Sequence, residues 1–68
     1  MYRKVVDYVV VGIIGEYGII KVKEKMFCDS GTAFKKVTVY DVCLEHGEGD
    51  IVASFDKISA ARKWAKEN

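Results

Sequence analysis

The densest group of side chains that could do chemistry lies in one short stretch near the middle of the second half. It contains Glu45, His46, Glu48 and Asp50. Carboxylate oxygens and an imidazole are ligands that divalent ions use, but the spacing is not that of a calcium-binding loop. No nucleophile stands near His46 in a recognisable context. We therefore expect no metal site, no cofactor and no catalytic residue, and we do not expect an enzyme.

Three early glycines invite a nucleotide-binding interpretation. Gly12, Gly15 and Gly18 do not match a dinucleotide fingerprint or a phosphate-binding loop, and they fall in a predicted hairpin, not before a helix. A chain of 68 residues also rarely encloses a ligand site of several hundred Å³. Binding through a surface is therefore the more promising direction.

One charged pattern could serve as such a surface. Lys21, Lys23 and Lys25 alternate with other residues, and a strand places alternate side chains on one face about 7 Å apart. That distance is close to the phosphate spacing of a nucleic acid strand, so a phosphate-backbone contact is one interpretation. The other, which we favour, is a solvated face or an edge that lysines protect against aggregation.

The cysteines and the N-terminus bear on the compartment. Cys28 and Cys43 form no CxxC motif and have no His at ligand spacing, so we expect reduced thiols in a cytoplasm. Arg3 and Lys4 precede an apolar run that resembles a short signal peptide, but Asp7 interrupts it and no small-residue cleavage site follows. The run is too short to span a bilayer. A net charge of +1 gives no bulk attraction to nucleic acid or membrane.

The C-terminal half predicts two strands and a helix. Residues 37–44 and 51–55 alternate with β-branched and aromatic types, and the segment between them contains Gly47 and Gly49, which can take the positive φ of a hairpin turn. Asp56 is expected to cap the following helix, with Phe55 packing on Ala60. Helical spacing gathers the residues expected to face the sheet. These are Ile58, Ala60, Ala61, Trp64 and Ala65.

The N-terminal half predicts a hairpin. Residues 5–14 and 19–27 are β-prone, with the turn near residues 15–18 and a loop over 28–33. Glu24 interrupts the apolar face of the second strand, which suggests an edge position or a local twist. The sequence therefore predicts one α+β domain over residues 1–68, with a β-β-β-β-α order. The fold would be a small antiparallel four-stranded sheet with one C-terminal helix packed on one face.

A run of apolar residues in the first strand covers both of its faces. It comprises Val9, Val10, Val11, Ile13 and Ile14. One helix covers only one face of a sheet, so the other face must expose these residues or bury them against a partner. The run is our candidate partner or dimer surface. The alternative is a twisted strand that wraps a small core.

The spacing F-x-x-x-x-x-A-x-x-x-A, from Phe55 through Ala61 to Ala65, loosely resembles the end of many small phage and bacterial domains. Arm-binding domains of tyrosine integrases end in a similar way. The resemblance covers less than half of the chain and assigns no family, but it implies a mobile-element origin or an accessory role. We therefore expect a non-enzymatic protein that binds another protein, as a phage inhibitor or regulator would, with a homodimer as one form. The alternative is a nucleic-acid-binding module that uses the three lysines.

Overall fold

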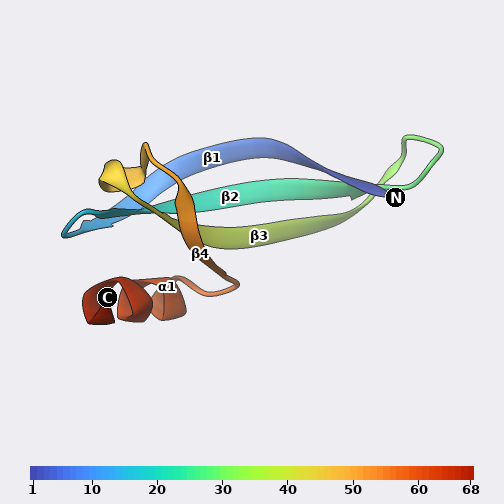
Figure 1. Cartoon of the computed structure of the whole chain (residues 1–68). Coiled ribbons are helices and arrows are strands. Elements are labelled where there is room, and N and C mark those ends of the chain that lie inside the picture. The colour runs from blue at the N-terminus through green and yellow to red at the C-terminus, as the bar shows by residue number, and fades with distance from the viewer.

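Alternating β-branched and aromatic residues build most of the molecule. The computed structural model describes all 68 residues and contains four strands, a short 3-10 helix and an α-helix (Figure 1). The elements are β1 (Tyr2–Ile14), β2 (Tyr17–Phe27), β3 (Ala33–Cys43), η1 (Glu45–Gly47), β4 (Ile51–Phe55) and α1 (Ile58–Glu67). The strands form one antiparallel sheet in the order β1-β2-β3-β4. The predicted α+β fold is confirmed.

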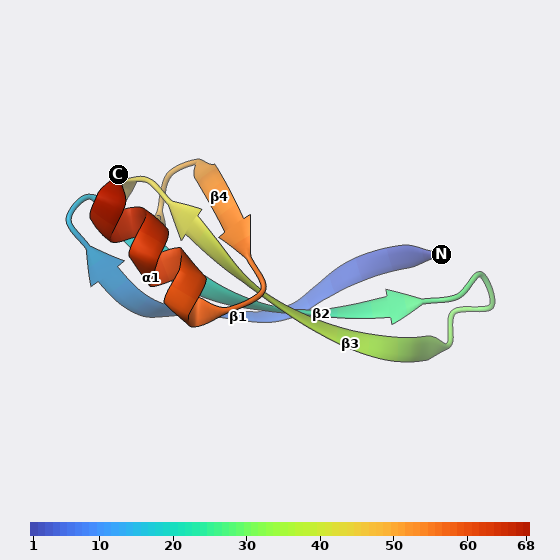
Figure 2. The same cartoon turned by 90° about the horizontal axis from the view of Figure 1, so that it is seen from below.

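The sheet is far longer than the elements that cover it. Strands β1, β2 and β3 have 11 to 13 residues each, whereas β4 has five and pairs only with Tyr40–Cys43. The helix, β4 and η1 all lie at one end of a molecule that measures 43 × 20 × 16 Å. The other end is an uncovered three-stranded extension (Figure 2). We call this extension the arm and define it as residues 1–10 and 21–39.

The main core lies where α1 packs on the sheet. Ile19 and Val42 are fully buried and contact Ala61 and Ala65 of the helix. Alanines have no long side chain, so the helix can approach the sheet closely. Trp64 lies at the border of this core. We call the sheet face that α1 covers the helix side.

A second, smaller cluster lies on the opposite face, which we call the loop side. Ile20, Val22 and Cys43 are buried there, with Val39 packed against them. The loop that contains η1 covers this cluster only at its end, where Gly47 lies over Ile20. The remainder of the loop side is uncovered, because no helix or strand packs on this face of the arm.

The two hairpin connections differ from the simple glycine turns expected. The first is tighter than predicted: Ile14 pairs with Tyr17, and Gly15 takes a φ of 59°. The second is not a plain turn but a one-turn 3-10 helix. Gly47 supplies the predicted positive φ, while Glu45 and His46 also adopt φ values of 54° and 60°. Such values are uncommon for residues with a Cβ.

Two local predictions are wrong. The helix begins at Ile58, with Lys57 in the N-cap position and no side-chain cap, so Asp56 does not cap it. The chain leaves β4 in an extended conformation for one residue more than expected, which places Asp56 too far from the first turn. Of the two alternatives for Glu24, the edge position is wrong because β2 is central, and the local twist stays a prediction. Arg3 on β1 compensates its charge at 3.7 Å.

Candidate functional site

The helix side of the arm is covered with lysines. Strand register sets Lys4, Lys25 and Lys36 opposite one another across three strands. Lys21 and Lys23 lie on the same side, because side chains two apart on a strand share a face. These five residues form what we call the lysine patch: Lys4, Lys21, Lys23, Lys25 and Lys36. The structure thus joins the three predicted lysines to two that are distant in sequence.

No lysine of the patch is ion-paired, and the one carboxylate on the same side of the arm is that of Asp7. The chain has two ion pairs, Met1 with Asp29 and Arg3 with Glu24, and neither includes a lysine of the patch. Asp7 stands opposite Lys23 in the register, but its carboxylate accepts a hydrogen bond from its neighbouring backbone N–H at 2.9 Å. Like charges on neighbouring strands repel one another. An anionic ligand would relieve this repulsion.

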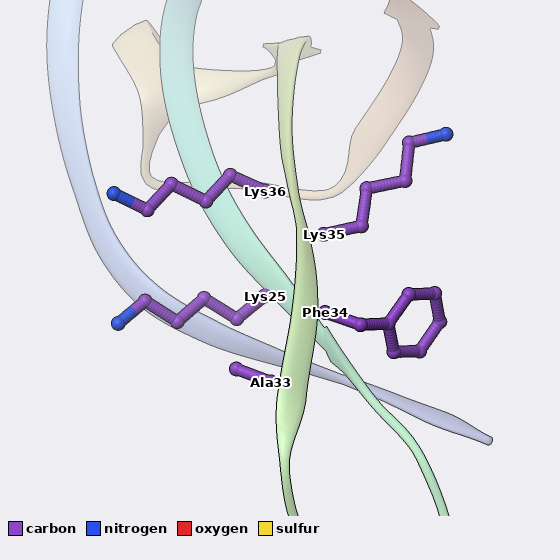
Figure 3. Close-up of a pocket in the computed structure, with 5 residues that line it drawn as sticks. All are labelled: Lys25, Ala33, Phe34, Lys35 and Lys36. Atoms are coloured by element: carbon purple, nitrogen blue, oxygen red, sulfur yellow. The ribbon is translucent and has the colours of Figure 1, made fainter.

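The surface beside the patch is hollowed at the free edge of β3. One hollow of about 270 Å³ is lined by Lys25, Ala33, Phe34, Lys35 and Lys36. Figure 3 shows that Lys25, Lys36 and Ala33 point to one side of β3, while Phe34 and Lys35 point to the other. A second hollow of the same volume lies between the strands, where Val6 accompanies Lys23 and Lys25. Lys25 and Lys36, which stand opposite each other on β2 and β3, line both hollows.

The loop side of the arm is apolar. Its register positions carry what we call the apolar patch: Val5, Tyr8, Val10, Met26, Val37 and Val39. Tyr8 is 71% exposed, Val5 52% and Val10 49%, and only Val10 is approached by another element, at Gly47 of the η1 loop. Charge on this side is limited to the Arg3–Glu24 pair, Lys35 near the tip of the arm, and Asp41 at its other end. Lysines therefore dominate the helix side of the arm, where Val6 and Val9 are also exposed, and apolar side chains dominate its loop side.

The predicted partner surface is divided by the structure. Val11 and Ile14 pack against the core beneath α1. Val9 stands opposite Lys21 on the helix side, whereas Val10 and Ile13 belong to the loop side. Val9, Val10 and Ile13 are all exposed. The run therefore does not form one surface.

Val5 and Tyr8 were not among the predicted contact residues, although they are central to the apolar patch. Register shifts at Val6 and Val11 separate them from the simple alternation of the strand. A β-bulge changes which face the following residues occupy, and it leaves no reliable trace in composition. Both residues lie within the predicted first strand, so what the sequence lacked was the face on which each would stand.

Charge is distributed unevenly along the molecule, which the net value of +1 conceals. The arm carries seven of the eleven Lys and Arg residues and three of the ten acidic residues. The remainder therefore carries four basic and seven acidic residues. Three of its carboxylates, Glu45, Glu48 and Asp50, are exposed in and beside the η1 loop. We call these three residues the acidic loop.

The other candidate residues are scattered. No three His, Cys, Asp or Glu side chains gather in a metal-ligating arrangement. Cys28 lies next to Ser30, with 2.9 Å between Sγ and Oγ. The Ser30 hydroxyl and then the backbone near Thr32 lower the pKa of the Cys28 thiol. Burial, followed by the negative charge of Asp41, raises the pKa of Cys43.

No family model matches the chain, and comparisons with curated proteins and with solved structures find no match. No helix in the structure has the length and apolar character required to cross a membrane. The two surfaces of the arm, the lysine patch and the apolar patch, are the features of the chain that bear on its function.

Proposed function

We propose that the chain is a small non-enzymatic binding protein that docks on another protein through the apolar patch. The observation that carries this proposal is the exposure of Tyr8, Val5 and Val10 on a sheet face that the η1 loop covers only at one end. A sheet with one face in water normally places polar residues on that face. The patch spans about eight residues of each of three strands that lie about 4.8 Å apart, so its footprint measures roughly 14 by 26 Å. Exposed apolar patches of this size, about 360 Å², often mark interaction sites.

We expect the chain to act by covering a surface of its partner. A small phage or mobile-element inhibitor or regulator would alter the activity of its partner in this way, without catalysing a reaction. We place this activity in the cytoplasm, where Cys28 and Cys43 would stay reduced.

Capture experiments with matched variants test the proposal. Tyr8→Glu places a charge in the apolar patch, while Thr38→Glu places the same charge on the helix side of the arm, at another exposed position. The immobilised wild-type chain and Thr38→Glu should retain a partner from a lysate of the source cell that Tyr8→Glu loses. Capture of the same proteins by all three chains would contradict the proposal.

A second candidate function is nucleic-acid binding through the lysine patch. Five lysines on one sheet face without ion pairs support it. The stacked rings of Tyr2 and Phe27, whose centroids are 5.2 Å apart, lie at the end of the same side. Lysines that track a phosphate backbone and nearby aromatic rings are features of single-strand binding surfaces.

A further inference from the structure

We propose that the partner of the apolar patch is a second copy of this chain, bound in a two-fold dimer. In this dimer the loop sides of the two arms stack face to face, and the arms run in opposite directions. The tip of each arm then lies against the acidic loop of the other copy. The inference rests on the proposed function and narrows it, because the protein that docks on the apolar patch is then a second copy and not a foreign protein.

Charge complementarity selects this arrangement. Lys35 lies near the tip of the arm, on the loop side, as Figure 3 shows relative to Lys25 and Lys36. The acidic loop lies at the opposite end of the same side, where the intervening His46 packs on Gly18 and Gly47 lies over Ile20. Neither Lys35 nor any carboxylate of the acidic loop has an ion-pair partner within the chain. Antiparallel stacking brings these opposite charges together at both ends of the interface.

Two other two-fold arrangements fit less well. A parallel stack would place the two basic arms together and the two acidic loops together, which like-charge repulsion disfavours. Pairing of the free β1 edges would meet bulges at Val6 and Val11. Bulges twist an edge and are a common protection against edge-to-edge pairing.

Interface size gives a second reason for including the acidic loop. The footprint of the apolar patch, about 360 Å², is roughly half of the ~800 Å² that each partner typically buries in a stable complex. Contacts between each arm tip and the opposite loop would enlarge the interface at both ends. A two-fold axis needs only one self-complementary surface, and the apolar patch with Lys35 and the acidic loop is such a surface.

The dimer leaves the remaining features of the chain free. The lysine patch and α1 lie on the helix side, so they would face outward on both copies. The assembly would be a two-layer β-sandwich with a cationic strip on each outer surface. Side chains of the two inner faces would interdigitate at a sheet separation of about 10 Å.

Sedimentation equilibrium of the full chain tests the dimer. The wild-type chain and Thr38→Glu should both have the mass of a dimer at concentrations of about 100 μM, a range that detects even weak association. Tyr8→Glu should raise the dimer Kd by at least about tenfold, since a charge in an apolar interface must be desolvated. A monomeric wild-type chain, or a dimer that Tyr8→Glu leaves unchanged, would overturn the inference.

A charge exchange tests the antiparallel arrangement without altering the apolar patch. Lys35→Glu and Glu48→Lys should each weaken the dimer, because each creates like charges across the interface. The two substitutions in one chain should restore the dimer, since the glutamate introduced at position 35 then faces the lysine introduced at position 48 of the other copy. A double variant that remains monomeric would overturn the proposed arrangement. A monomeric wild-type chain that still loses a foreign partner on Tyr8→Glu would overturn the dimer but leave the proposed function standing.

Discussion

The backbone of His46 lies directly on Gly18, and no space for a side chain remains between them. A methyl group added at Gly18 would overlap the His46 carbonyl and the Gly47 nitrogen. The N–H of His46 also donates a hydrogen bond of 2.9 Å to the carbonyl oxygen of Glu16 in the first hairpin turn. The η1 loop is therefore held on the β1–β2 hairpin by one close approach and one hydrogen bond. This contact places Gly47 over Ile20, at one end of the loop-side cluster.

Gly18→Ala should displace the η1 loop and lower the free energy of unfolding. Overpacking of this kind typically costs about 1 to 3 kcal/mol. Gly12→Ala is the control, because its added methyl group would meet no atom within 4 Å. Urea melts followed by circular dichroism measure both variants. Equal stability of the two would contradict the close contact between Gly18 and the loop.

Trp64→Ala should destabilise the fold by about 3 kcal/mol, the lower end of the range for a deleted aromatic core residue. Trp64 is only half-buried, but it packs edge-on against Tyr17 with ring centroids 5.3 Å apart. Lys63→Ala, at the adjacent exposed position, should stay within about 0.5 kcal/mol of the wild type. Urea melts again give the values. A loss below about 1 kcal/mol for Trp64→Ala would show that this ring does not hold the helix on the sheet.

The fold was predictable because local signals agreed with one another. The alternation of residues 37–44, the helical spacing of Ala61 and Ala65, and the glycine near the first turn all indicated the observed elements. The lysines on one face of β2 followed from strand periodicity alone. These features depend on residues close in sequence, where the backbone geometry is nearly fixed.

The rest depends on tertiary context that the sequence does not display. Lys4 and Lys36 join the other lysines only through the strand register. The length of the uncovered arm could not be predicted, because the helix position along the sheet was unknown. Asp56 has the side chain of a good N-cap, but one additional extended residue, Lys57, takes the N-cap position instead.

Cys28 should react with iodoacetamide at lower pH than Cys43. The thiolate is the reactive form, and the Ser30 hydroxyl favours it at Cys28 by lowering the thiol pKa. Burial and the charge of Asp41 raise the pKa of Cys43, so its reaction should begin only at higher pH. Alkylation at each site can be followed by mass spectrometry over a pH series. Ser30→Ala should move the Cys28 profile to higher pH, and coincident profiles for the two wild-type thiols would contradict the assignment.

If the lysine patch binds nucleic acid, alanine at Lys23, Lys25 and Lys36 should weaken that binding at every sequence tested. Each lost phosphate contact should flatten the plot of log affinity against log salt by about 0.7 for a single strand, so three lost contacts give about 2. Alanine at Lys57, Lys63 and Lys66 removes the same charge from outside the arm and is the control. Fluorescence anisotropy with a labelled oligonucleotide provides the measurement. Absence of wild-type binding at about 50 mM salt would reject this function.

Val10→Asp and Val11→Asp should have opposite consequences, although the residues are neighbours. Val11 packs against the core beneath α1, so an aspartate there buries a charge and should unfold the chain. A domain of this size has only about 3 to 5 kcal/mol of net stability to lose. Val10 is half-exposed on the loop side, so Val10→Asp should retain most of the fold and weaken self-association.

Circular dichroism and sedimentation equilibrium on the same samples separate these effects. The expected result is a folded monomer for Val10→Asp and an unfolded chain for Val11→Asp. Two equally unfolded variants would show that both valines are internal. A folded Val10→Asp dimer would instead place the interface away from this strand. Strand alternation already places the two neighbours on opposite faces, and the structure decides which of the two enters the core, because Val11 packs beneath α1 while Val10 pairs with Ile20 on the loop side.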